Sequence, residues 1–238
     1  GGDDMKPILF NTDMVRAILE GHKTVTRRVV KVPLQIWCDH GGQHEFIRDD
    51  FIEGTHFTGF VCKKCGYGVC SPHRKFPVGS SWIRPPYRSG DILYVRETFR
   101  IDYLSNIPGT GRIHYKADGS YSDFSFMPER YEMMRRAQLK PGWRPNENMP
   151  REAARIFLRL TDVRVERLQE MPPYDIAFEG FRKQKDFIAL WNSTIKPSDR
   201  ALYGWDANPW VWVIQFERCE RPKEVFPHGG AVEGGRLT

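Results

Sequence analysis

The spacing of apolar residues changes along the chain and predicts short helices and strands. In residues 11–20 the apolar side chains recur at helical spacing, and Gly21 can end the helix. Residues 24–30 alternate instead, which predicts a strand with Thr26 and Arg28 on one face. Further strands are predicted at 91–98, 112–116, 154–168 and 209–216, and further helices at 127–138, 173–179 and 187–193. Strands separated by short helices, without regular strand–helix alternation, predict an α+β fold built on a small mixed barrel.

Residues 32–88 interrupt this pattern and predict an inserted module. The stretch is rich in glycine and proline, and the pattern of the main domain resumes after it. We therefore expect a discontinuous domain formed by residues 5–31 and 89–219, with the inserted module between its two parts. The glycine-rich residues 220–238 are expected to form a flexible tail.

Cysteine spacing in the inserted module predicts a structural zinc site of zinc-ribbon-like type. Cys62 and Cys65 belong to a C-x-x-C-G turn, in which two thiolates can bind one ion. The candidates for the other two ligands are Cys38 and Cys70, together with His40, His44 and His73. Thiolates favour Zn²⁺, and the metal could fold a module that has little apolar core of its own. A redox C-x-x-C pair or unpaired surface cysteines are the alternatives.

Composition narrows the class of protein. The 238 residues include 40% hydrophobic residues, enough for a folded core, and no apolar run long enough to cross a membrane. Five cysteines, an odd number, indicate a reduced, cytoplasmic compartment rather than a secreted disulfide scaffold. The net charge of +6 favours polyanionic partners, although both signs are mixed along the chain.

Four segments carry a family resemblance. Residues 18–28 read I-L-E-G-H-K-T-V-T-R-R, residues 89–97 contain G-D-x-L-x-V, and residues 163–181 pass from a strand into a helix ending A-x-E-G. In this order they resemble the ASCH domain family of the PUA-like superfamily of β-barrel proteins. The Trp-rich residues 205–214 resemble the closing strand of the family's phage and prophage branch. The resemblance covers most of residues 5–219 apart from the inserted module.

The resemblance implies recognition of a nucleobase or a nucleic acid, RNA more than DNA, and it implies a hydrolase that removes the acyl group from N4-acetylcytidine. The implied catalytic residues are Lys23, Thr26 and Glu179. Thr26 would be the nucleophile, Lys23 with a lowered pKa would take its proton, and Glu179 would orient Lys23 or protonate the leaving amine. Arg27, Arg28 and Glu97 are the candidate substrate contacts.

The residues also allow other functions. Lys23 and Glu179 could form an ordinary salt bridge, and Glu97 could be the structural partner of an arginine. The basic tracts and interleaved aromatic residues of the inserted module would suit a non-catalytic RNA- or DNA-binding module. A ribonuclease is a third possibility, but the sequence shows no acidic cluster for two-metal chemistry.

Overall fold

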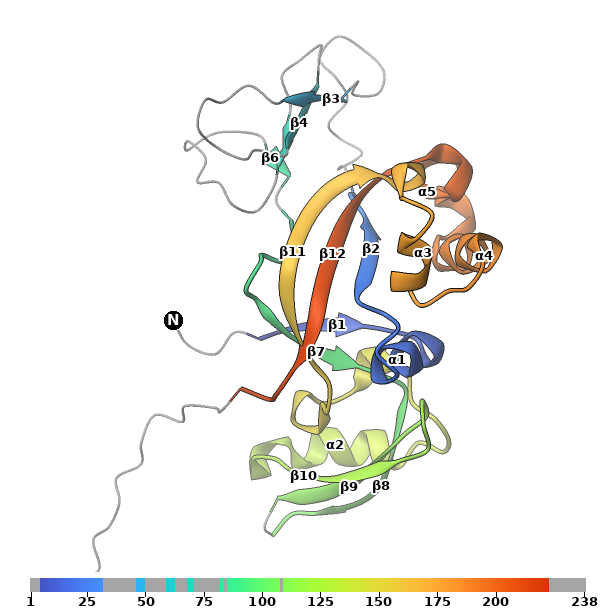
Figure 1. The fold of residues 1–238 in the computed structure, drawn as a ribbon. Helices are drawn as coiled ribbons and strands as arrows, with labels where there is room; N and C mark the ends of the chain where they lie inside the picture. Colours follow the sequence, from blue (N-terminus) through green and yellow to red (C-terminus); the bar gives the residue numbers. More distant parts are fainter. Residues whose placement is uncertain are drawn as a thin grey trace, which may run out of the picture.

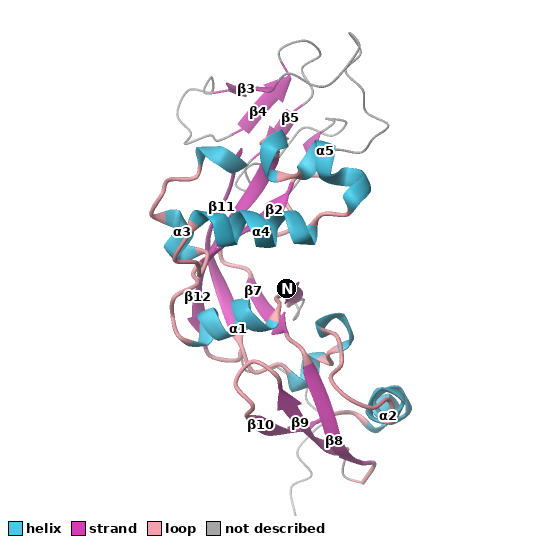
Figure 2. Cartoon of the chain, turned by 90° about the vertical axis from the view of Figure 1, so that its right-hand side faces the viewer, coloured by secondary structure: helices cyan, strands magenta, loops and turns pink. Residues whose placement is uncertain are grey.

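The computed structural model describes residues 5–31, 46–49, 59–62, 68–70, 82–83, 85–107 and 109–222. In the four short segments between residues 46 and 83 it describes the backbone only. The chain forms separate β-sheets flanked by short helices (Figures 1 and 2). This confirms the predicted α+β class.

The main sheet has five strands in the order β1 (Lys6–Leu9), β7 (Ile92–Arg96), β11 (Phe157–Arg167), β12 (Trp210–Cys219) and β2 (Val25–Val29). β1 pairs parallel with β7, and the other pairs are antiparallel. The sheet is open in the described part of the chain, because β1 and β2 are its edges and do not pair with one another. The closed barrel predicted from the sequence is therefore not formed by these strands.

Helix α1 (Thr12–Leu19) connects the two edge strands and packs into the core of the main sheet. The Asn11 side chain caps it by accepting a hydrogen bond from the Met14 amide at 2.9 Å. Its buried residues Val15 and Ile18 join the core beneath the sheet. The apolar side of α1 thus forms part of this core.

Two cores lie against the main sheet. One contains side chains of β1, α1, β7, β11 and β12, among them Phe10 and Trp212. The other contains Val211 and Val213 of β12 and is covered by α3 (Asp175–Phe178) and α4 (Gln184–Thr194). The short helix α5 (Arg200–Tyr203) follows α4. Since Val213 alternates with buried Trp212 and Ile214 on β12, the two cores occupy opposite faces of this strand. The alternation predicted for residues 209–216 is therefore that of a strand buried on both sides.

A second sheet, which the sequence pattern largely missed, contains β8 (Phe99–Ser105), β9 (Thr110–Tyr115) and β10 (Tyr121–Ser125). Only the middle strand was expected. Helix α2 (Tyr131–Gln138) covers one face, with Met134 buried against Phe99 and Ile113. The sheet thus has its own core.

The remaining elements are short. Single 3₁₀ turns lie at Pro128–Arg130, Asn146–Asn148, Arg151–Ala153, Leu168–Glu170, Pro197–Asp199 and Trp205–Ala207. A third sheet has the order β3 (Phe46–Asp49), β4 (Gly59–Cys62), β5 (Gly68–Cys70) and β6 (Trp82–Ile83). In the part of the chain that is described, no helix has the length and apolar character needed to span a membrane.

A buried ion pair is placed between the main sheet and the second sheet. Glu97, between β7 and β8, is 1% exposed and accepts two hydrogen bonds from Arg155, at 2.8 and 2.9 Å. Arg155 also contacts Asp118 at 2.8 Å and lies 3.9 Å from the centroid of the Tyr115 ring. Burial raises the pKa of Glu97, and Arg155 opposes that rise. Glu97 is thus the structural partner of an arginine, one of the two roles expected for it.

Replacement of Arg155 should destabilise the fold strongly. We expect Arg155→Ala to lower the free energy of unfolding by about 3–5 kcal/mol, because it leaves the Glu97 carboxylate buried without a cation. The matched control is Arg159→Ala, which removes a half-exposed side chain whose contact with Glu217 is 3.8 Å long and should change stability by less than about 0.5 kcal/mol. Urea denaturation measures both, and equal effects would refute a supporting role for the buried pair.

Candidate active site

The end of α1 and the end of α3 are brought together by a short irregular segment. Gly21 has φ +77° and ends α1, and the backbones of Lys23 and Glu179 then form an isolated β-bridge. The Thr24 amide donates to the carbonyl of Phe178 at 2.9 Å, and the Thr24 carbonyl accepts from Phe216 of β12 at 2.9 Å. Residues 156 positions apart in the sequence therefore meet through backbone hydrogen bonds.

Lys23 is fully enclosed and its ammonium has three acceptors. Nζ lies 2.6 Å from Oε2 of Glu179, 3.0 Å from the Glu179 carbonyl oxygen and 2.8 Å from the carbonyl oxygen of Val25. The side chains of Lys23 and Glu179 are 0% and 2% exposed. The structure thus brings together the lysine and the glutamate expected to act as a pair, and all three ammonium protons are used.

Burial lowers the pKa of Lys23, because desolvation penalises the charged amine. The Glu179 carboxylate acts in the opposite direction, and the nearby cations of Arg28 and Arg27 add to the lowering. A lysine whose neutral form is more accessible than usual can accept a proton from a nucleophile, which is the role proposed for it from the sequence.

Arg27 extends the pair into a network. Its guanidinium is fully enclosed and donates to Oε1 of Glu179 at 3.2 Å, to Glu166 of β11 at 2.7 Å and to Asp175 of α3. Two cations and three carboxylates are therefore gathered at the junction of β2, β11 and α3. Because Arg27 is occupied by these carboxylates, it holds elements together and does not face a ligand in this conformation.

The other expected residues lie around this network. Thr26 is 1% exposed and sits opposite Ile214 of β12. Arg28 is half-buried, donates to the Leu9 carbonyl at 2.7 Å and lies 5.4 Å from the centroid of the Phe10 ring. Glu97, held by Arg155, belongs to the separate network between the sheets.

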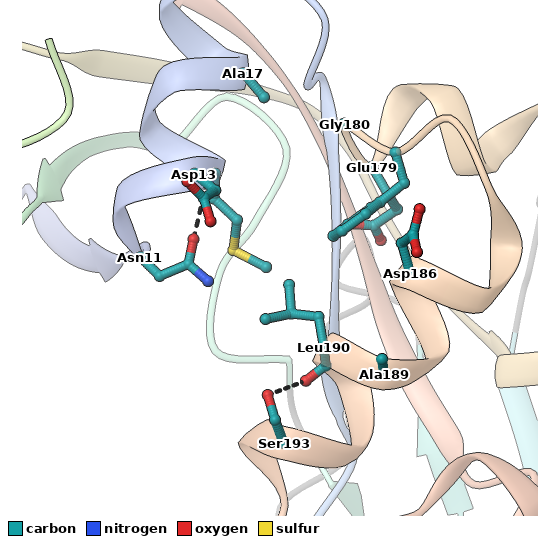
Figure 3. Close-up of a pocket in the computed structure, with 11 residues that line it drawn as sticks. Asn11, Asp13, Ala17, Glu179, Gly180, Asp186, Ala189, Leu190 and Ser193 are labelled. Carbon is teal, nitrogen blue, oxygen red and sulfur yellow. Dashed lines mark hydrogen bonds between the residues drawn. The ribbon is translucent and has the colours of Figure 1, made fainter.

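A cavity of about 360 Å³ opens between α1 and α4 (Figure 3). Its lining residues are Asn11, Asp13, Met14, Ala17, Glu179, Gly180, Phe181, Asp186, Ala189, Leu190 and Ser193. Among the described residues, the lining includes Glu179 but neither Lys23 nor Thr26. Glu179 is thus a lining residue of the cavity, while its carboxylate is 2% exposed and is directed to Lys23 and Arg27. The Thr26 hydroxyl is not reached from this cavity.

Sequence reasoning missed several residues of this site. Asp175 and Glu166 were not expected, although each stands near a predicted helix or strand end. Asp13 and Asp186 line the cavity, and each is the acidic residue of the first turn of its helix. Acidic residues at such positions commonly stabilise the helix dipole, so their pattern alone carries no signal of a site.

The expected metal ligands fall largely outside the described residues. Cys38, Cys65, His40, His44 and His73 are not described, and of Cys62 and Cys70 only the backbone is. Within the side chains that are described, no group of three or more metal-binding residues comes together.

A scan against protein-family models, a search of curated proteins and a search of solved structures found no match for this chain.

Gly180 should be required for the close approach of α3 to α1. It has φ +90°, and an added Cβ would lie 3.0 Å from the Cβ of Ala17 and 3.4 Å from that of Lys23. We expect Gly180→Ala to lower the free energy of unfolding by about 2–4 kcal/mol, from backbone strain plus crowding. The matched control is Gly142→Ala, where φ is +79° and no atom lies within 4 Å, so only the strain of about 1–2 kcal/mol applies. Thermal denaturation that gives equal losses would contradict the crowding.

Proposed function

We propose that the chain recognises a nucleobase in the cavity beside Glu179 and hydrolyses an N-acyl group of an N4-acylated cytidine. The observation that carries the proposal is the enclosed Lys23–Glu179 contact of 2.6 Å, whose glutamate also lines a cavity of about 360 Å³. That volume lies within the range of sites that bind small ligands. The proposal places the chain, by its sequence motifs, in the ASCH family with a PUA-like architecture.

The proposed reaction needs one nucleophile and one proton carrier. An oxygen nucleophile forms a bond to the acyl carbon, the carbon–nitrogen bond breaks, and the exocyclic amine leaves with a proton. Glu179 lines the cavity and is the group that would carry that proton, but its carboxylate is 2% exposed and held by Lys23 and Arg27, so it would first have to turn toward the ligand. Lys23 exchanges a proton with it through their direct hydrogen bond. Water is a suitable nucleophile in the cavity. Thr26, the nucleophile implied by the family resemblance, would first have to become accessible.

The lining of the cavity supports a nucleoside over a phosphorylated ligand. Asp13 and Asp186 add carboxylates to that of Glu179, and Asp13 is neutralised by Arg16 at 2.9 Å. A phosphate beside Asp186 would be repelled, whereas a cytosine ring offers an amino group and ring nitrogens to such carboxylates. Binding of RNA without catalysis remains the second candidate, since the chain has a net charge of +6.

Loss of either member of the pair should abolish hydrolysis. We expect Lys23→Met and Glu179→Gln each to lower kcat for N4-acetylcytidine by a factor on the order of 100 or more. Glu179→Gln leaves the Lys23 ammonium without its carboxylate, and Lys23→Met leaves the Glu179 carboxylate with Arg27 alone. The double variant removes both charges of the pair and therefore serves to separate folding from catalysis. It should fold and remain inactive. Lys185→Ala, on the exposed side of α4, is the control and should keep full activity.

The pH profile provides the second measurement of the same prediction. Because burial lowers the pKa of Lys23, its neutral form becomes available below the usual range of a lysine. Activity that needs the neutral amine should rise with pH through that lowered pKa, and Lys23→Met should lack this limb. A profile that falls there instead, or an active Glu179→Gln enzyme, would refute the assignment. Full activity in Thr26→Val would identify water as the nucleophile.

We propose a structural zinc ion in the inserted module, with Cys62 and Cys65 as two of its ligands. β4 and β5 run antiparallel and the C-x-x-C-G turn lies between them. Gly59 is the partner of Cys70, so Cys70 stands three residues, about 10 Å, along the hairpin from Cys62. That offset is long for two ligands of one tetrahedral ion. The register therefore favours Cys38 and one of the histidines as the other ligands, with Cys70 outside the set.

Metal analysis tests the zinc proposal. The purified protein should contain one zinc per chain, and Cys62→Ser or Cys65→Ser should lose it, because a structural site requires all four ligands. Cys219→Ser, which changes the free thiol at the end of β12, is the control and should retain the metal. A zinc-free protein with five reactive thiols would exclude the site.

A further inference from the structure

The outward face of the second sheet carries two rows of side chains in a regular arrangement. Since α2 and its core occupy one face, alternate residues project from the other. The register places Arg100, His114 and Tyr121 across one row, and Tyr103, Arg112 and Asp123 across the next. We call these six residues the outer grid.

Aromatic rings and guanidinium groups alternate within the outer grid. The Arg112 guanidinium lies 4.5 Å from the ring centroid of Tyr121 and 5.8 Å from that of Tyr103. Its plane is held by a bidentate ion pair with Asp123, at 2.7 and 3.0 Å. Arg100 lies 5.8 Å from the ring centroid of Trp143, which extends the row of rings beyond the sheet.

These rings remain open to solvent although they are large. Tyr121 is 58% exposed, Tyr103 44% and Trp143 43%. The inward residues of the same strands, such as Ile113 and Phe99, are 0% exposed. Exposed aromatic rings held in fixed positions by salt-bridged arginines indicate a surface on which flat groups can stack.

We propose that the outer grid, with Trp143, binds single-stranded nucleic acid by stacking of its bases. The grid has no aliphatic side chain, whereas the centre of a protein–protein interface is apolar and poor in charge. Its arginines are already paired, Arg112 with Asp123 and Arg100 with Asp102 at 3.2 Å. Few phosphates can therefore be bound here, and affinity must come from the rings. Stacking on aromatic residues is tolerant of sequence and suits unpaired bases, whose faces are free.

This proposal is separate from the hydrolytic site. The outer grid lies on β8, β9 and β10, and it shares no residue with the cavity between α1 and α4. A chain that binds a single strand on one sheet and a base in a separate cavity could act on a nucleotide unit within a polymer. Binding to the outer grid does not require any reaction in the cavity, so the binding proposal and the hydrolysis proposal can be tested independently.

Fluorescence anisotropy with the full-length chain tests the grid, using a labelled 12-nucleotide oligouridylate and, in parallel, oligodeoxythymidylate. We expect Tyr121→Ala and Tyr103→Ala each to raise the Kd by about 5- to 100-fold, the measured worth of one stacked base. Tyr121→Phe retains the ring and should stay within about twofold of wild type. Tyr174→Ala removes another exposed ring, the 66% exposed residue just before α3, and should have no effect.

The salt dependence separates stacking from a simple electrostatic surface. Because the arginines of the grid are neutralised, the affinity should fall less than about tenfold between 50 and 200 mM salt, where six phosphate contacts to a single strand would cost about 300-fold. A duplex of the same length, whose bases are not free, should bind more weakly. Absence of binding to either single strand overturns the proposal, as do unchanged affinities in both tyrosine variants or a steep salt slope that they do not alter. These binding results do not depend on whether Lys23→Met is active in hydrolysis. A negative result for nucleic-acid binding by the outer grid can therefore be told apart from a negative result for the proposed hydrolysis.

Discussion

The enclosed carboxylate of Glu179 is the group on which the candidate site depends. A carboxylate without water must be neutralised, and here Lys23 contacts one oxygen and Arg27 the other. Lys23 stands at the end of α1 and Arg27 on β2, so both elements are held in place against α3. The same requirement that stabilises the junction also places a charged pair beside a cavity. The same residues can therefore have both a structural role and a chemical role.

A second buried carboxylate, Glu97, repeats the arrangement between the two sheets. Arg155 binds it in bidentate fashion, and its guanidinium also lies 3.9 Å from the centroid of the Tyr115 ring. This pair spans the boundary between the core of the main sheet and the core beneath α2. Polar groups thus join the parts of the molecule, while apolar side chains stabilise each part from within.

The described surfaces differ in the chemistry that they offer. The cavity between α1 and α4 presents carboxylates and short apolar side chains, which suit an uncharged ligand. The outer grid presents tyrosine rings separated by arginines whose charge is already balanced. Neither surface is a continuous positive patch, so the net charge of +6 does not by itself locate a binding site. The candidate binding sites are located instead by the positions of the individual rings and carboxylates.

The local pattern of the sequence determined α1, the alternating strand β2 and the long strands β11 and β12, because caps and periodicity act within a few residues. Family-like motifs in the sequence also indicated Lys23 and Glu179 as candidate site residues.

Other features depended on the tertiary structure alone. Whether β1 and β2 pair, and so close a barrel, depends on contacts between strands that are distant in sequence, and the sheet proved open. The strands flanking β9 escaped notice because a register irregularity after Ile101 interrupts the alternation in β8, and because the inward residue Ser122 of β10 is polar. The partners of Arg27 and Glu97 could not be known either, since an ion pair depends on which charges the fold brings within a few ångströms and not on their spacing along the chain.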